Sequence, residues 1–427
     1  MKRALVLSGG GAKGSYQIGV WKAIRKLYKK IDIVVGTSIG SINAAMVAQK
    51  EYKNAKKLWL NIKTKDLFDY DTSKDLIDNK ENIKKIISNK GLENDKAINF
   101  LKTVINEQKI RSSKIKYGLV TYNLKTKTPK YLSIENIPNG KLIDYIFASS
   151  TCFPIIEKKE IDGEYYIDGG FYDNMPINLA IDMGANEIIA VDLSVLSIKQ
   201  KIKDNNVKVD IIKNKDKKLF SLDFNKEYAK KQIAIGYNDT MKYFKQLDGN
   251  IYTFKKNDLS KNYNKINKYY IDLLNKILLT QNNNAIVNQI FKISKYNKIF
   301  TDIKQNKKID NIINDSLEYL ATIFSIPNEK IYNITKFNKT LIRKAKELEY
   351  IKLDKNLKGK MLIGYIYNKY MNSEDKEKEI KELFNIALIF QKDFLSAIYL
   401  IAISKHYPLT LKNEEYYKEL YKSAYKY

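Results

Sequence analysis

The chain has 427 residues, of which 44% are hydrophobic and 12% aromatic, so it can build a packed core and is not a disordered, low-complexity protein. Its one cysteine, Cys152, excludes an intrachain disulfide and fits a reducing compartment. The formal net charge of +28 favours an anionic partner, although an AT-rich coding sequence would give the same surplus of Lys without one.

The first part of the chain alternates strand and helix patterns. Its first apolar run ends at Leu7 and is shorter than a secretory segment of about 7–15 residues, so it predicts a strand rather than a signal peptide. Strands are expected at 3–8, 31–35, 116–122, 129–134, 165–167 and 187–193, and helices at 12–29, 38–49 and 224–245. This alternation predicts an α/β fold with a mostly parallel central sheet covered on both faces.

The remaining segments predict a cap and a second domain. Residues 50–110 are helical and charged and are expected to form an insertion or cap, 198–218 an irregular loop, and 250–255 a last edge strand. From 256 onward only helical spacing occurs, so we expect domains at 1–255 and 256–427, the second all-helical and of unknown role. The formal charge is about +10 over residues 1–200 and about +18 over the rest, which concentrates the basic character in the helical part.

A glycine-rich segment directly follows the first expected strand and precedes the first helix. It reads Gly9-Gly10-Gly11-Ala12-Lys13-Gly14. Glycines let a ligand approach the backbone closely, and the unpaired amides at a helix start attract an anion. That anion is either the oxyanion of an acyl-transfer intermediate or a pyrophosphate, because the segment also satisfies G-x-G-x-x-G. A dinucleotide site would need an acidic residue at the end of the second strand, whereas Asp32 stands at its beginning.

A second motif, Gly36-Thr37-Ser38-Ile39-Gly40, lies between the second strand and the next helix. This is G-x-S-x-G in the context that it needs, where a tight turn exposes the serine hydroxyl at the carboxyl edge of the sheet. Side chains at the two flanking glycine positions would collide with the neighbouring strand and helix. The helix N-terminus behind Ser38 also favours a developing alkoxide, so Ser38 is the candidate nucleophile.

The third motif, Asp168-Gly169-Gly170, follows the strand expected at 165–167. The glycine pair would let the carboxylate turn into a cleft, although Asp-Gly-Gly alone is most often a plain turn. The chain's one histidine, His406, lies in the helical C-terminal region, where a helix end is expected. A Ser-His-Asp triad therefore lacks a well-placed histidine, and we expect a carboxylate to activate Ser38 directly.

In this order the three motifs resemble those of the patatin-like phospholipases, which use a Ser-Asp dyad without histidine. The 130 residues that separate Ser38 from Asp168 suit that family. Further matching segments are Gly14 with Gly19, Ala148-Ser149 with Phe153-Pro154, and Asn174-Met175-Pro176. The resemblance covers about residues 3–195 and says nothing about 256–427. One departure is Lys13, where the family usually has Arg, so a bidentate contact there would be weakened.

The resemblance implies a three-layer hydrolase domain and a mechanism for it. Asp168 would accept the Ser38 proton while Ser38 attacks a fatty-acyl ester, and water would then hydrolyse the acyl-enzyme. The oxyanion would be held by backbone amides of Gly9, Gly10, Gly11 and Ala12, with Lys13, Gly14, Gly36, Gly40, Gly169 and Gly170 in support. No metal or cofactor is expected, because the sequence shows neither a His/Cys cluster nor a calcium-loop pattern.

Several questions of partner and function stay open from the sequence. The implied substrate is a phospholipid or another acyl lipid, and the basic helical region predicts peripheral contact with an anionic membrane. Nucleic acid is not expected, because the basic residues are mostly Lys rather than Arg. The sequence contains no run of about 18 apolar residues, so no transmembrane helix is expected. This favours a cytoplasmic location. The alternatives are a catalytically silent membrane- or partner-binding protein and, less favoured, a dinucleotide-binding protein; the oligomeric state is unknown.

Overall fold

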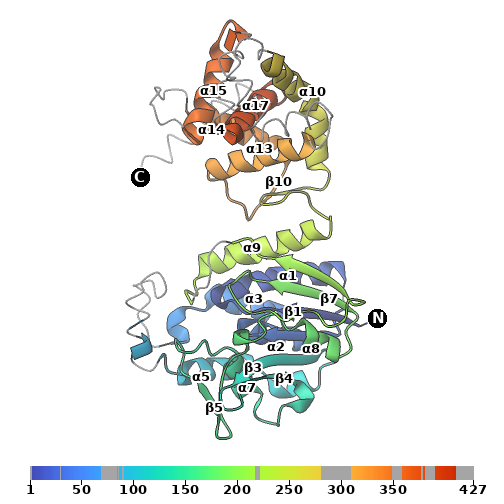
Figure 1. The fold of residues 1–427 in the computed structure, drawn as a ribbon, viewed down its shortest axis with the longest axis vertical. Coiled ribbons are helices and arrows are strands. Elements are labelled where there is room, and N and C mark those ends of the chain that lie inside the picture. Colours follow the sequence, from blue (N-terminus) through green and yellow to red (C-terminus); the bar gives the residue numbers. More distant parts are fainter. Residues whose placement is uncertain are drawn as a thin grey trace. The chain divides into compact units, whose positions relative to one another are not determined.

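The computed structural model divides the chain into two compact units, Met1–Phe244 and Lys245–Tyr427 (Figure 1). The structure describes residues 2–28, 30–68, 84, 86–88, 91–216, 222–279, 309–348, 358–376, 378–379 and 390–409. The division falls before the boundary expected near 255, because residues 250–252 donate backbone hydrogen bonds to Glu318 of the second unit.

The first unit is built on an eight-stranded sheet with the order β5-β6-β3-β2-β1-β7-β8, and β4 pairs with β3 outside this path. The strands are β1 (Arg3–Leu7), β2 (Ile33–Thr37), β3 (Lys116–Asn123), β4 (Thr128–Ser133), β5 (Lys159–Ile161), β6 (Glu164–Asp168), β7 (Glu187–Asp192) and β8 (Lys208–Lys213). Strands β3, β2, β1, β7 and β8 run parallel, whereas β4, β5 and β6 add antiparallel pairs at one side. The mostly parallel sheet expected from the sequence is thereby confirmed.

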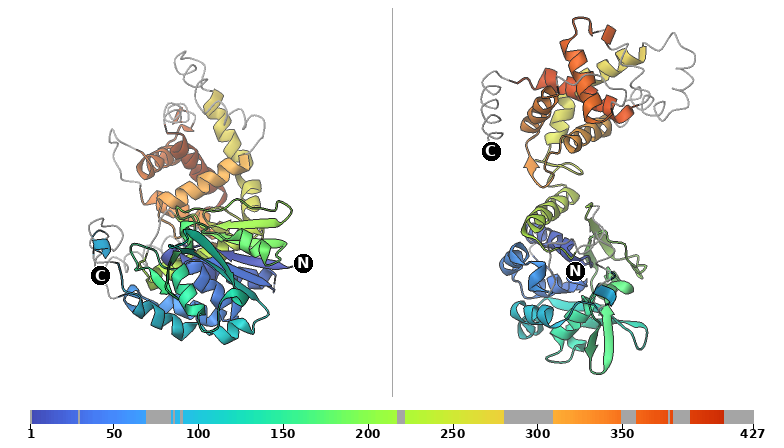
Figure 2. Two further views of the ribbon diagram at one scale, coloured as in Figure 1. Left: turned by 60° about the horizontal axis from the view of Figure 1, so that its bottom comes forward. Right: turned by 90° about the vertical axis from the view of Figure 1, so that its left-hand side faces the viewer.

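Helices cover both faces of this sheet, as Figure 1 and Figure 2 show. They are α1 (Ser15–Leu27), α2 (Ile39–Ala48), α3 (Tyr52–Asn61), α5 (Asp95–Val104), α6 (Glu107–Arg111), α7 (Leu142–Ser149), α8 (Ile177–Asp182) and α9 (Lys226–Tyr243). Alternate residues of β1 point to opposite faces. Leu5 and Leu7 pack among residues of α1, α2 and α9, whereas Ala4 and Val6 pack among residues of α8. The three layers explain why the strands read as continuous apolar runs.

Two glycines let α1 and α9 pack with their backbones in contact. A Cβ atom on Gly19 would lie 2.0 Å from the Ile233 carbonyl oxygen, and one on Gly236 would lie 2.1 Å from the Tyr16 carbonyl oxygen. Any side chain at these positions would separate the helices. The glycine at position 19, which matches the family pattern, is therefore explained by the packing of α1 against α9.

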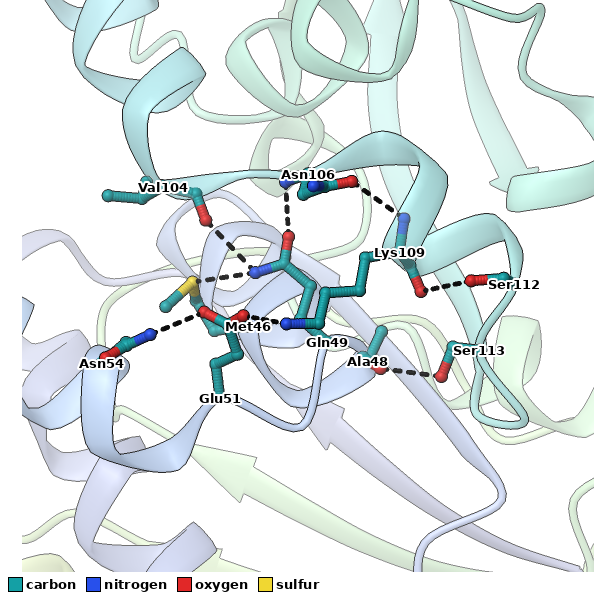
Figure 3. A network of polar contacts seen from close by, with 10 residues as sticks. All are labelled: Met46, Ala48, Gln49, Glu51, Asn54, Val104, Asn106, Lys109, Ser112 and Ser113. Carbon is teal, nitrogen blue, oxygen red and sulfur yellow. Dashed lines mark hydrogen bonds and ion pairs between the residues drawn. The ribbon is translucent and has the colours of Figure 1, made fainter.

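The segment 50–110, expected as an insertion or cap, packs onto the core of the first unit. Trp59 of α3 and Leu101 of α5 belong to the same buried cluster as Leu5 of the sheet. Polar contacts fix the segment as well (Figure 3): Gln49 donates to the Val104 carbonyl at 3.2 Å and accepts from the Asn106 amide at 2.6 Å. Residues 69–83 of this segment lie outside the described part of the chain.

The second unit is helical in its described residues, apart from one short pair of strands. Its elements are β9 (Thr253–Phe254), α10 (Asp258–Leu279), α13 (Ile309–Ile323), β10 (Ile331–Tyr332), α14 (Ile334–Lys346), α15 (Lys360–Asn372) and α17 (Gln391–His406). Helix α17 is central and packs against α10, α13, α14 and α15. A strand does form within the expected range 250–255, but this strand, β9, pairs with β10 and does not join the edge of the large sheet. No helix in the described ranges combines the length and apolarity of a membrane span.

Candidate active site

Ser38 occupies a strained turn between β2 and α2. Its backbone angles are φ 57° and ψ −134°, a conformation that non-glycine residues rarely adopt and that costs on the order of 1–3 kcal/mol. The surrounding structure holds it there. The Ser38 amide donates to the Ser149 hydroxyl at 3.0 Å, and the Ser38 carbonyl accepts from the Ser41 amide at 2.8 Å and the Ser41 hydroxyl at 2.7 Å. The turn therefore fixes the direction of the Ser38 side chain.

The glycines on either side of Ser38 are places of close backbone approach. A Cβ atom on Gly40 would lie 2.1 Å from the Leu7 carbonyl oxygen of β1. One on Gly36 would lie 2.2 Å from the Gly40 carbonyl oxygen. The first turn of α2 can thus sit directly against β1 and β2 only when both positions lack a side chain.

Asp168 ends strand β6 and meets Ser38 across the sheet edge. The Ser38 hydroxyl lies close enough to the Asp168 carboxylate to lower its pKa, and the carboxylate accepts from the Gly170 amide at 2.7 Å. The two residues are only 8% and 7% exposed. Burial raises the pKa of Asp168 to about 6, although the hydrogen bonds from Ser38 and Gly170 lower it. The structure therefore brings together the hydroxyl and carboxyl groups that the sequence places on separate motifs.

Asp173 anchors the loop that follows Asp168. It is fully buried, accepting from the Met175 amide at 3.2 Å and from the Tyr131 hydroxyl at 3.2 Å. Its backbone carbonyl accepts from the Thr37 hydroxyl at 2.9 Å, which ties the loop to the residue before Ser38. Burial raises the pKa of Asp173, with the hydrogen bond from Met175 the largest opposing contribution.

Asn174 clamps the glycine-rich loop, a role that the sequence did not reveal. Its side-chain oxygen accepts from the Gly9 amide at 3.2 Å and its side-chain nitrogen donates to the Gly9 carbonyl at 3.3 Å. A Cβ atom on Gly9 would lie 2.4 Å from that oxygen, and one on Gly170 would lie 2.9 Å from it. In this structure the Gly9 amide is engaged by Asn174, whereas Gly9 was expected among the oxyanion donors.

The amides of Gly10, Gly11 and Ala12 remain as candidate donors. Residues Gly11–Gly14 form a short 3-10 helix, whose first amides have no partner within the helix. Gly11 lines the same cavity as Ser38. A Cβ atom on Gly10 would lie 2.9 Å from the Leu193 side chain, so this glycine is also needed for packing. An ester oxygen in the cavity could therefore meet these amides.

The other expected supporting residues serve packing and anchoring. A Cβ atom on Gly14 would lie 2.7 Å from the Ile39 side chain, and one on Gly169 would lie 2.3 Å from the Val120 carbonyl oxygen. Lys13 is buried, and its ammonium donates to the Asp216 carbonyl at 3.1 Å. Burial lowers the pKa of Lys13, while Asp216 and Asp192 act in the opposite direction. Lys13 thus fastens the segment after β8 to the glycine-rich loop.

A buried polar relay behind the loop was also missed by the sequence analysis. Asn43 of α2 donates to the Gly14 carbonyl at 3.0 Å and to the Gln17 side chain at 2.7 Å, and it accepts from the Trp59 indole at 2.9 Å. Gln17 donates in turn to the Ser8 carbonyl at 2.7 Å. One signal for these contacts was present in the sequence: Gln17 and Asn43 are polar residues on the apolar faces of their helices. Such a residue is expected to have a hydrogen-bond partner, but the sequence does not identify that partner.

An apolar cavity opens beside Ser38. It is narrow, with a volume of about 90 Å³ that the centres of water-sized groups can occupy. The lining residues are Gly11, Ser38, Ile39, Ile42, Asn43, Leu58, Trp59, Ile62, Leu67, Phe68, Ala97, Phe100, Leu101, Phe147, Ser150, Cys152, Ile156, Leu222 and Phe224. Burial raises the pKa of Cys152 to about 12, with Asp168 adding to the rise, so its thiol stays neutral near pH 7. The lining suits a hydrocarbon chain.

The remaining candidates lie elsewhere. His406 is at the end of α17 in the second unit, where its ring packs edge-on against Tyr269 with 6.1 Å between centroids. Asp32 at the start of β2 accepts from the Arg3 amide at 3.0 Å and pairs with Lys30 at 2.7 Å, so it is not directed to a ribose. Within the described ranges, no group of three His, Cys, Asp or Glu residues could hold a metal ion.

Comparison with known proteins finds similarity within the first unit. The pattern that describes the patatin-like phospholipases matches residues 5–181. The chain is 28% identical over 198 residues to patatin-like phospholipase domain-containing protein 7 of Mus musculus, covering 44% of this chain and 13% of that protein. It is 30% identical over 194 residues to lysophospholipase nte1 of Aspergillus terreus, covering 44% of this chain and 12% of that protein. The chain thus spans about an eighth of the length of these relatives.

Two solved structures are similar at low identity. The crystal structure of VipD from Legionella pneumophila shares 14% identity with a TM-score of 0.36, covering 96% of this chain and 92% of that one. The crystal structure of the type III effector protein ExoU shares 13% identity with a TM-score of 0.31, covering 93% and 76%. Residues 5–181 therefore carry the sequence pattern of the patatin-like phospholipase family.

Proposed function

We propose that this protein is a lipid acyl hydrolase that cleaves fatty-acyl esters of phospholipids or related lipids, with Ser38 as the nucleophile and Asp168 as its base. One observation carries the proposal: Ser38, which lines an apolar cavity, lies beside the buried Asp168 carboxylate, close enough to lower its pKa. The family of residues 5–181 supports the same chemistry.

The geometry supports a two-step mechanism. Asp168 accepts the Ser38 proton as the Ser38 oxygen attacks the ester carbonyl carbon. The raised pKa of about 6 makes Asp168 a stronger base than an ordinary aspartate, yet leaves it ionised near pH 7. The ester C–O bond then breaks, and Asp168 returns the proton to the leaving alcohol. Water, activated by the same carboxylate, cleaves the acyl-enzyme and releases the fatty acid.

Charge on the carbonyl oxygen is stabilised by the glycine-rich loop in this proposal. The amides of Gly10 and Gly11, with Ala12 next to them, are the donors that the loop leaves available. Loss of one such donor typically costs about 3–4 kcal/mol of transition-state stabilisation. The acyl chain lies in the apolar cavity, where each buried methylene contributes about 0.8 kcal/mol of binding.

The nucleophile is tested with p-nitrophenyl acyl esters and a fluorophosphonate probe. Ser38→Ala should lose both ester hydrolysis and covalent labelling. Ser150→Ala is a matched control, because Ser150 lines the same cavity but bonds the Ile146 carbonyl of its own helix at 3.0 Å. Retained hydrolysis or labelling by purified Ser38→Ala would overturn the assignment. Failure of the unaltered protein to label would favour the catalytically silent alternative.

The proposal includes peripheral contact with an anionic membrane surface. Exposed apolar side chains support it: Leu196 is 97%, Ile198 54% and Phe171 47% exposed. They border the site, because the Ile198 carbonyl accepts from the amide of Asn174, the residue that clamps the glycine-rich loop, at 2.8 Å. The high net charge of +28 favours anionic lipid in addition.

Vesicle sedimentation tests this contact. Binding should be stronger to anionic than to neutral phospholipid vesicles and should fall in Leu196→Asp. Ile211→Asp is the control, since Ile211 is 39% exposed on the edge strand β8. Equal binding to both kinds of vesicle would remove the role of charge, and unchanged binding of Leu196→Asp would remove the role of the apolar loop.

A further inference from the structure

Two hollows of the first unit lie back to back. The first is the apolar cavity that contains Ser38. The second hollow is formed by residues of α2, α3 and α5 and by the segments beside them, and neither Ser38 nor Gly11 lines it. Three residues line both hollows: Leu58, Ile62 and Phe100. Because each of these three residues borders both hollows, we treat them as a thin wall between the two spaces.

The wall residues come from two helical segments. Leu58 lies on α3 and Ile62 directly follows its end, four positions later, so both side chains point to the same side. Phe100 lies on α5. Leu58 and Phe100 are only half-buried although both are apolar, because the second hollow is open to them.

The second hollow has a mixed lining. The polar residues Glu51, Asn54, Lys57, Asn61, Asp66 and Thr103 stand beside the apolar Met46 and Val104. A chain that passed the wall would leave an apolar lining and meet these polar groups, so it would gain less from each further methylene than in the first cavity.

A fixed network supports the helices that carry the wall (Figure 3). At the start of α3, Glu51 accepts from Asn54 at 3.0 Å and forms an ion pair with Lys109 of α6. At the end of α5, Gln49 holds the backbone of Val104 and Asn106. The start of α3 is thus tied to α6, and the end of α5 is tied to Gln49 at the end of α2, so both helices that carry the wall are anchored.

We propose that Leu58, Ile62 and Phe100 form the end wall of the acyl cavity and set the longest acyl chain that the cavity can bury. The proposal rests on the proposed function in naming the ligand as a fatty-acyl chain. Affinity should rise by about fourfold for each added methylene up to the wall and level off beyond it.

The test measures chain-length dependence without requiring catalysis. In a Ser38→Ala background, saturated fatty acids from C6 to C18 compete with a fluorescent fatty acid, and Kd is measured for each length. Phe100→Ala and Ile62→Ala should move the length at which affinity levels off to longer chains, by two carbons or more. Ile62→Phe, which thickens the wall, should move it to shorter chains. The two opposite shifts keep the test decisive if one variant fails to fold.

Leu101→Ala is the matched control, because Leu101 lies next to Phe100 on α5 but lines only the first cavity. It should weaken binding of all chain lengths by a similar factor and leave the levelling point in place. An unchanged levelling point in folded Phe100→Ala and Ile62→Phe overturns the wall, even if the parent enzyme hydrolyses esters. If the parent protein does not hydrolyse esters but the variants still shift the levelling point, the proposed function is overturned and the proposal for the wall is retained.

Discussion

Replacing Asp168 with Asn should stabilise the first unit near neutral pH while removing its activity. Burial raises the pKa of Asp168 from 3.8 to about 6. The folded state therefore binds the Asp168 proton more tightly than the unfolded state does. As the pH rises from below 3.8 to above 6 the carboxyl ionises, and the free energy of unfolding falls. An amide carries no charge at any of these pH values and avoids the cost.

The size of the effect follows from the two pKa values. A rise of about two pKa units corresponds to about 3 kcal/mol, fully present above about pH 7 and absent below about pH 3. About half of this cost is already present at pH 5, so the advantage of the Asn variant should grow by about 1.4 kcal/mol between pH 5 and pH 8. The Asn oxygen can still accept from the Gly170 amide, but less strongly than a carboxylate, which reduces the net gain.

Urea unfolding followed by tryptophan fluorescence measures this difference for the correct unit. The chain has two tryptophans, Trp21 and Trp59, and both lie within residues 1–244. Ser38→Ala is the control, because it removes the hydrogen bond to Asp168 but leaves the buried carboxyl in place. If the Asn variant gains no stability relative to the parent between pH 5 and pH 8, the carboxyl does not carry the burial cost argued above.

Three further predictions test other parts of the same site. Hydrolysis of a short-chain ester, measured as kcat/KM, should rise with pH about a midpoint near 6, because only ionised Asp168 accepts the serine proton; a flat profile from pH 5 to pH 8 would exclude it as the base. Gly40→Ala should prevent correct folding, because its Cβ would lie 2.1 Å from the Leu7 carbonyl oxygen, and a native fluorescence spectrum would contradict this. Gln49→Leu should lower the free energy of unfolding by about 1 kcal/mol in the same urea assay, because two partly buried backbone groups lose their hydrogen-bond partner; an unchanged value would show that water replaces the side chain.

The elements that sequence alone could predict are those with a local signal. The continuous apolar runs before Gly9 and Gly36 predict buried strands, and the glycines that follow predict sharp turns into helices. Strand β8 was missed because it lies at the sheet edge, where Lys208, Asp210 and Lys213 alternate with the apolar residues and resemble a loop. A half-exposed edge strand has no continuous apolar run, so its composition is that of a surface loop.

Contacts between distant segments left no such signal. Asn174 clamps Gly9 across 165 positions of sequence, and nothing in the residues around either one specifies the other. The division between the two units lies about ten residues before the expected boundary for the same reason. Residues 253–254 alternate like an edge strand, but their pairing partner is Ile331–Tyr332 of the second unit. Strand periodicity predicts that a segment is extended but not which strand it joins.

The register of three strands explains how a carboxyl group reaches Ser38 without a histidine between them. Thr37, at the end of β2, pairs with Val120 of β3, and the next residue of β3, Thr121, pairs with Asp168 of β6. Because β6 runs antiparallel to β3, its last residue comes to the same edge at which β2 ends, one position away from the nucleophile. Side chains alternate between the two faces of a sheet, so a slip of one residue in the β3–β6 pairing would turn Asp168 to the opposite face. The proposed dyad is therefore positioned by backbone pairing within residues 1–244, and a substitution that shifts this register should abolish activity even with both side chains intact.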